Sequence, residues 1–337
     1  MKTILVIGAN GFVGTHTLEY LLKQENINVI AACRDKSKLS KKFQGEIREG
    51  DVRDEAYLKN LLKGVDVVVN AMSWTALFGQ SKNSEQFFYQ PTLRIIDAFL
   101  SSHAHQFINI STTSASSPDN SRDANSKGII RPLWPHLVNV VKIEDCIRQK
   151  ASKEKTFINL RLGIFVGEHY GLGILPILLP RLKTHLVPWV AGGKTELPLT
   201  DGRDIGQAMG LAALKEGLSG YQSFNVIGSE VPSVRDVILF LNQEYGYPKP
   251  HFSVPFSVAY PFAWLMEKID PIVPWEPLIV RSIVHLLENT GADNKRATDI
   301  LGYVPQVHWR DSVRAQITEM NKYQTQVMSM VKRIPTN

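Results

Sequence analysis

Short runs of β-branched and apolar residues alternate with longer amphipathic stretches over the first half of the chain. A short apolar run bounded by polar residues predicts a strand, and apolar residues at helical spacing predict a helix. The predicted strands are 3–8, 28–33, 66–72, 106–112 and 156–163, and the predicted helices are 11–25, 55–64, 91–103 and 136–151. This alternation predicts an α/β fold, a Rossmann-type doubly wound parallel sheet with helices on both faces.

The pattern changes after about residue 165, where glycine, proline and aromatic residues become frequent. We therefore predict a dinucleotide-binding Rossmann domain over residues 1–165 and a smaller C-terminal substrate-binding region over 166–325. Residues 224–228 (FNVIG) form another apolar run. That run predicts a strand that returns to the sheet, so some segments of the second region are expected to complete the first.

Composition excludes several classes of protein. The chain has 337 residues with 38 Lys+Arg, 32 Asp+Glu and two cysteines, which is typical of a globular chain rather than a disordered one. Two cysteines make neither a disulfide framework nor a four-cysteine zinc site, so we expect a cytoplasmic protein without a metal centre. No dense basic stripe interleaved with aromatic residues indicates nucleic-acid binding.

The late apolar stretch 254–266 is too short to span a bilayer, which takes about 20 apolar residues. We therefore predict no transmembrane segment. Two interpretations of the stretch stay open. It is either an ordinary buried helix or an apolar lid that makes peripheral contact with a membrane.

The strongest local signal is a glycine turn between the first predicted strand and helix. Its residues are Gly8, Asn10, Gly11, Phe12, Val13 and Gly14. In this context the first glycine permits a tight turn, the second lets the backbone approach a pyrophosphate, and the third lets helix and strand pack closely. The free N–H groups at the start of the helix would then bind the phosphates.

This turn and several later motifs resemble the extended short-chain dehydrogenase/reductase family. That family contains NAD-dependent epimerase/dehydratases, 3β-hydroxysteroid dehydrogenases and dihydroflavonol reductases. The similar segments, over roughly residues 1–315, are IGANGFVG, GDVRD (50–54), VVVNAM (67–72), LRLGIFVG (160–167), TDGRDIGQAMGLAAL (200–214) and 294–317. The resemblance implies a cofactor site that includes Asp51, Val52, Ala71 and Gly163. It also implies a homodimer formed through the helices at 91–103 and 136–151.

The end of the second strand bears on which dinucleotide binds. An acidic residue there is typical of NAD enzymes, whereas an arginine suits the 2′-phosphate of NADP. Arg34 and Lys38 stand in this place, with Asp35 between them. We predict NADP(H) as the favoured cofactor, with NAD(H) possible. A solvated basic loop without a cofactor role is the alternative.

The catalytic segment departs from the family pattern. The resemblance implies a hydroxyl residue after the fifth strand, matched by Thr112, and a Tyr-x-x-x-Lys motif whose lysine is matched by Lys142. Val138 then stands where the tyrosine belongs, and no tyrosine occurs between Tyr89 and Tyr170. Tyr170 and His136 are alternative acids. Substrate or water could also handle the proton, or the chain could bind the cofactor without turnover.

The C-terminal region is rich in large apolar residues and predicts an apolar small-molecule substrate. The function we predict is hydride transfer between NADP(H) and a hydrophobic alcohol or ketone. A nucleotide-sugar epimerase or dehydratase is one alternative, although Arg181, Arg203 and Arg281 form no cluster that would bind a diphosphate. A catalytically silent NADP-binding sensor or assembly protein is the other.

Overall fold

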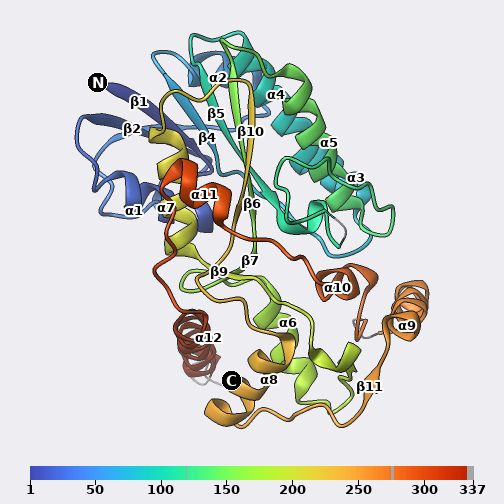
Figure 1. Ribbon diagram of the computed structural model, residues 1–337. Coiled ribbons are helices and arrows are strands. Elements are labelled where there is room, and N and C mark those ends of the chain that lie inside the picture. Colours follow the sequence, from blue (N-terminus) through green and yellow to red (C-terminus); the bar gives the residue numbers. More distant parts are fainter. Residues whose placement is uncertain (119, 275–276, 332–337) are drawn as a thin grey trace.

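A seven-stranded sheet forms the centre of the molecule (Figure 1). The computed structural model describes residues 1–118, 120–274 and 277–331, with side chains up to residue 322. Every pairing in the sheet is parallel, and the strand order is β10-β6-β5-β4-β1-β2-β3. The strands are β1 (Lys2–Ile7), β2 (Ile27–Cys33), β3 (Glu46–Glu49), β4 (Val67–Asn70), β5 (Gln106–Thr112), β6 (Thr156–Leu162) and β10 (Tyr221–Val226).

Helices cover both faces of this sheet because successive side chains of each strand point to opposite sides. Ile4 and Val6 of β1 face the core beneath α1 (Phe12–Leu21), α7 (Gly202–Leu214) and α11 (Lys295–Leu301). Leu5 and Ile7 face the second core, beneath α2 (Glu55–Leu61), α4 (Gln90–Leu100) and α5 (Pro135–Lys150). The doubly wound α/β fold that the sequence predicts is confirmed.

Two sheets of two short strands each and several helices lie below the central sheet in Figure 1. β7 (Ile164–Val166) pairs with β9 (Leu199–Asp201), and β8 (Trp189–Val190) pairs with β11 (Ser253–Val254). The helices here are α6 (Ile174–Leu182), α8 (Val234–Tyr245), α9 (Phe256–Ile269), α10 (Arg281–Leu286) and α12 (Trp309–Val331). Near the site lie the short helices α3 (Ser81–Ser84), η2 (Glu85–Tyr89) and η3 (Thr113–Ala115), while η1 (Lys36–Lys38) and η4 (Ala191–Gly193) occupy loops.

Segments after residue 165 return to the sheet. β10 pairs with β6, and α7 and α11 cover the same face of the sheet as α1. The strand expected at 224–228 therefore lies in the sheet, at 221–226. The division into regions 1–165 and 166–325 stays a prediction. The two regions are interleaved, because segments after residue 165 belong to the sheet that the first region forms.

The sequence pattern missed β3. Its residues, Glu46 to Glu49, read EIRE, and three of the four are exposed at the edge of the sheet. An edge strand with little burial needs no apolar run, so hydrophobic periodicity does not reveal it. Among the described helices, none is both long and apolar enough to cross a bilayer.

Candidate functional site

β1 and β4 are neighbours at the centre of the sheet. From β1 the chain continues to β2 on one side, and from β4 it continues to β5 on the other, so a crevice opens at the carboxyl ends of these two strands. A ligand in an open α/β sheet binds at this switch point. Gly8 follows β1 with φ of +78°, a conformation that favours glycine. A Cβ atom at Gly8 would lie 2.8 Å from both the carbonyl oxygen of Ala71 and the amide nitrogen of Met72. The tight approach of the two strand ends therefore requires glycine at this position.

Gly11 and Gly14 have different surroundings. A Cβ at Gly14 would overlap the carbonyl oxygen of Gly8, so this glycine lets α1 pack against the turn. A Cβ at Gly11 would have only the Gly8 carbonyl oxygen near it, at 3.3 Å, and otherwise open space. α1 begins after Gly11 without a side-chain cap. Its first N–H groups therefore face a space that fits the pyrophosphate of a dinucleotide.

The loop after β2 carries the candidate residues for the adenosine end. The Asn10 amide donates to the carbonyl oxygen of Asp35 at 3.0 Å and so ties the glycine turn to this loop. The Asp35 carboxylate accepts from the backbone and hydroxyl of Ser37 and lies 3.5 Å from Lys38 Nζ. These hydrogen bonds, above all from the Ser37 hydroxyl, lower the pKa of Asp35. Its carboxylate is therefore ionised and turned into its own loop.

Arg34 contrasts with this arrangement. It is exposed and, within the part of the chain that the structure describes, takes no hydrogen bond or ion pair. Asp51 lies nearby but is held by Arg53, whose Nη2 is 2.6 Å from Oδ2. That hydrogen bond lowers the pKa of Asp51 to about 2. Val52 packs against the second core. The guanidinium of Arg34 is thus one cation that a ligand at this end of the crevice could bind.

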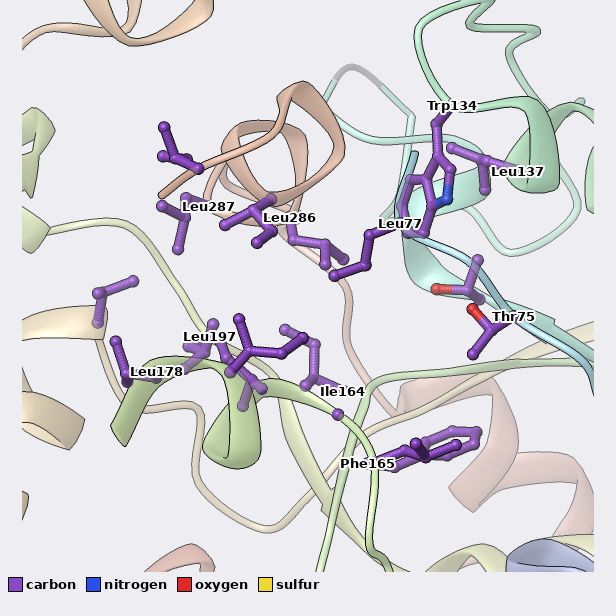
Figure 2. Close-up of a pocket in the computed structure, with 18 of the residues that line it drawn as sticks. Thr75, Leu77, Trp134, Leu137, Ile164, Phe165, Leu178, Leu197, Leu286 and Leu287 are labelled. Carbon is purple, nitrogen blue, oxygen red and sulfur yellow. The ribbon is translucent and has the colours of Figure 1, made fainter. Parts of the chain in front are cut away.

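A cavity of about 870 Å³ extends from the glycine turn into the C-terminal region. Phe12 and Val13 of the turn line one end, and the buried Gly163, between β6 and β7, lines its wall. Figure 2 shows side chains from both parts of the chain around one space. Those from the sheet side are Thr75, Leu77, Trp134 and Leu137, and those from the C-terminal region are Leu178, Leu197, Leu286 and Leu287. The substrate side of the site is therefore almost wholly apolar.

The hydroxyl residues at the end of β5 have different surroundings. Ser111 donates to Oε1 of the buried Glu144 at 2.5 Å. Thr112 also lines the cavity, and its Oγ1 accepts from the backbone N–H of Ser114 at 3.2 Å. This hydrogen bond leaves the Thr112 hydroxyl proton for another acceptor, and the catalytic role that the family resemblance implies for Thr112 stays a prediction. The Ser111 hydroxyl is already engaged.

α5 is fixed in register by a buried ion pair. Arg161 of β6 and Glu144 of α5 are both fully buried, and Arg161 Nη2 lies 2.6 Å from Glu144 Oε2. Residues four and eight positions before Glu144 lie near the same face of the helix. These residues are Val140 and His136, and both line the cavity.

This register bears on the predicted roles of Val138 and Lys142, which stay predictions. Val138 and Lys142 lie two positions further along, about 200° around the helix from His136 and Val140. Neither lines the cavity. Lys142 is exposed, and its Nζ lies 5.5 Å from the centre of the Tyr89 ring. The face of α5 that lines the cavity therefore carries His136 and Val140 rather than Val138 and Lys142.

His136 is buried rather than exposed at the start of its helix. Its Nδ1 lies 3.1 Å from Ser84 Oγ, which also accepts from the Asn139 amide at 3.0 Å. The Phe88 ring lies 4.7 Å from the imidazole. Since Nδ1 is engaged, Nε2 is the ring nitrogen left for the cavity. Burial lowers the pKa of His136 to about 4, so the ring is neutral near pH 7.

Tyr170, the other alternative acid, also lines the cavity. Its ring packs 4.6 Å from that of Phe12 and 5.7 Å from that of Phe165. Burial raises the pKa of Tyr170 to about 12, so the phenol keeps its proton at neutral pH. Among the described residues, no group of three or more His, Cys, Asp or Glu side chains could hold a metal ion.

Comparison with known proteins agrees with this architecture. A model described as the NAD dependent epimerase/dehydratase family matches residues 4–226. The chain is similar to the solved structure of gox2253, with 20% identity, a TM-score of 0.73, and 96% of this chain and 99% of that one covered. It is also similar to MoeE5 in complex with UDP-glucuronic acid and NAD, with 19% identity, a TM-score of 0.70 and coverage of 95% and 99%. The UDP-glucuronic acid 4-epimerase of Bacillus cereus, in complex with UDP-glucuronic acid and NAD, gives the same four values.

Proposed function

The chain belongs to the NAD dependent epimerase/dehydratase family, and we propose that it is an oxidoreductase that transfers a hydride between NADP(H) and an apolar alcohol or ketone. The observation that carries this proposal is the continuity of the apolar cavity with the glycine turn, through Phe12 and Val13. A cavity of this size suits a small molecule of considerable hydrophobic surface.

The partners of Arg181, Arg203 and Arg281 argue against a nucleotide-sugar substrate, although structural neighbours bind such ligands. Arg181 lines the cavity, but its guanidinium donates to the carbonyl oxygens of residues 177, 277 and 278. Arg203 is ion-paired with Asp201, and Arg281 with Glu267. A diphosphate would have to compete with these partners for charge-assisted hydrogen bonds. An apolar substrate needs none of them.

The cofactor would be held by the glycine turn and the loop after β2. Bound there, a nicotinamide dinucleotide supplies or accepts the hydride. The N–H groups of α1 would bind its pyrophosphate. Arg34 would bind a 2′-phosphate, whereas the Asp35 carboxylate is engaged by Ser37. These contacts favour NADP(H) over NAD(H).

Two side chains would then act on the substrate oxygen. The Thr112 hydroxyl donates a hydrogen bond to it. His136 holds or accepts the proton at Nε2, because the Ser84 hydroxyl can either donate to Nδ1 or accept from it. In oxidation the neutral ring would accept the alcohol proton at Nε2 and become an imidazolium, whose Nδ1–H donates to Ser84 Oγ. In reduction a proton taken from water would form the imidazolium, which would donate it to the substrate oxygen. Tyr170 is the second candidate for the proton, since its phenol lies in the same cavity.

A substrate panel tests the proposal. Purified protein is mixed with NADPH or NADH and with apolar ketones of increasing size, and cofactor oxidation is followed by absorbance. We expect turnover that rises with ketone hydrophobicity and that UDP-sugars do not support. Epimerisation of a UDP-sugar would establish the nucleotide-sugar alternative instead. Tight NADPH binding without turnover of any ketone or alcohol would indicate the silent sensor. Homodimer formation through α4 and α5 and a cytoplasmic location also stay predictions.

A further inference from the structure

The mouth of the cavity is formed by apolar side chains that face outward. Leu172, Leu186, Phe252, Val258 and Phe262 line the cavity, and yet each is between 42% and 63% exposed. Single exposed apolar residues are ordinary on protein surfaces. These five are both exposed and part of the cavity lining, so they connect the protein surface with the cavity. We call these five residues the rim.

α9 continues the rim, and it buries its small residues rather than its large apolar ones. The buried residues of this helix are Ala259 and Ala263, its small ones. Trp264 and Leu265 are nearly half exposed and lie outside the cavity lining. Figure 1 shows α9 at the outer edge of the molecule. A helix that buries alanines and exposes tryptophan and leucine presents an apolar outer side, which is the usual mark of an interaction surface.

Lysines outnumber carboxylates around the rim and α9, where Glu267 is ion-paired with Arg281 and Asp270 ends the helix. Residues 169–195 and 245–266 contain no aspartate or glutamate. Lys183 and Lys249 in these segments are exposed, as is Lys268, whose Nζ lies 6.0 Å from the Trp264 ring. A surface that joins exposed apolar residues to lysines matches the interface of an anionic bilayer, where apolar side chains enter the acyl boundary and lysines meet headgroups.

We propose that the rim and α9 dock on the surface of an anionic lipid bilayer, so that an apolar substrate enters the cavity directly from the lipid. The helix lies on the bilayer and does not cross it. The route of entry rests on the proposed function, because it takes the substrate to be apolar. The docking itself rests on the exposed residues alone.

Vesicle flotation of the full-length protein tests the docking. Vesicles of phosphatidylcholine with 30% phosphatidylglycerol, about a third anionic lipid, are compared with phosphatidylcholine alone, with neither cofactor nor substrate present. The double variant Trp264→Glu/Leu265→Glu places two carboxylates on the outer face of α9. Val304→Glu is the matched control, because Val304 is 51% exposed and follows α11 beside the sheet. Circular dichroism checks that all three proteins are folded.

We expect the wild type and Val304→Glu to float with anionic vesicles, and the double variant to lose at least tenfold in binding. Equal flotation of all three proteins, or of none, would overturn the proposal. So would a wild-type dimer in sedimentation that the double variant converts to a monomer, because a second copy would then cover the rim.

Turnover of a short, water-soluble ketone without vesicles separates this proposal from the proposed function. Trp264 and Leu265 lie outside the cavity lining, so we expect the double variant to keep that turnover. Flotation without any turnover would leave the docking supported and the proposed oxidoreductase function rejected.

Discussion

The two ends of the cavity are built from different kinds of atoms. At the glycine turn the surface facing a ligand is main chain, and a Cβ at Gly8 or Gly14 would collide with neighbouring backbone. At the substrate end the surface is side chain, mostly apolar and chemically repetitive, with Thr112, His136 and Tyr170 among its few polar groups. The difference implies that cofactor affinity depends on glycines, which have no side chain, whereas turnover depends on a few polar side chains in an apolar wall.

The largest effect should come from removing the proton carrier. His136→Phe keeps a ring in the pocket but has no proton to exchange, so we expect turnover to fall by about 10²- to 10⁴-fold. Affinity for the dinucleotide should change less than threefold, because the glycine turn is untouched. Steady-state kinetics with a ketone substrate and calorimetric titration of NADPH measure the two quantities.

Two controls sharpen that result. Lys142→Met removes the lysine that is exposed over Tyr89, and its turnover should stay within twofold of the wild type. Tyr170→Phe tests the second candidate acid. If Tyr170→Phe loses the activity and His136→Phe keeps it, the assignment of the proton to His136 is wrong.

Affinity should respond instead to a side chain added at the turn. Gly11→Val fills the space in front of α1, so we expect NADPH binding to weaken by more than about a hundredfold. The space there is open, and the fold should therefore survive, with a melting temperature close to that of the wild type. Retained binding in a calorimetric titration would mean that the cofactor lies elsewhere.

The buried imidazole should also make stability depend on pH. The pKa of His136 is about 4 in the folded protein, against an ordinary value of 6.5. As pH falls from 6.5 to 4, only the unfolded chain takes up the proton, so the folded state loses up to about 3 kcal/mol. His136→Phe lacks this loss. The difference in unfolding free energy between variant and wild type should therefore shift in the variant's favour across that window.

Urea unfolding at pH 7, 5.5 and 4.5 measures this difference. Burial raises the pKa of Asp204 to about 6, which changes stability in the opposite direction. That contribution is common to both proteins and cancels in the comparison. Parallel stability curves for variant and wild type would contradict a buried neutral His136.

The smallest effect concerns cofactor preference. Arg34→Glu replaces the available cation with an anion, so NADPH should bind about tenfold more weakly while NADH is little changed. Titration of both cofactors into wild type and variant gives the ratio. Lys142→Glu makes the same charge change on the exposed face of α5 and should leave the ratio unaltered. Equal affinities of the wild type for NADPH and NADH would contradict a role for Arg34 in the preference.

Much of the fold follows from local pattern, because the buried strands of a parallel sheet are short apolar runs. The glycine turn was equally accessible, since its spacing and its strand–helix context determine backbone geometry. β3 was not, because an exposed edge strand has no hydrophobic signature. These elements differ in how far residues adjacent in sequence determine their structure.

The orientation of α5 is harder to predict for a related reason. Residue type alone points to Lys142, whereas the face that the helix turns to the cavity depends on the buried pair of Glu144 with Arg161, 17 positions later in the chain. The burial of His136 depends on Ser84, 52 positions away. A helix-face argument could have helped, since Val140, Val141 and Glu144 share the buried side and Lys142 does not.

The return of β10 has a consequence for how the chain could be divided. All seven residues of β6 are buried, and β10 covers the hydrogen-bonding edge of β6 with a register that runs from Phe157 to Leu162. A protein ended at residue 165 would expose the backbone N–H and C=O groups of that edge, which favours pairing with other chains. Such a truncated protein should aggregate. The return of β10 to the sheet thus protects solubility as well as completing the fold that carries the site.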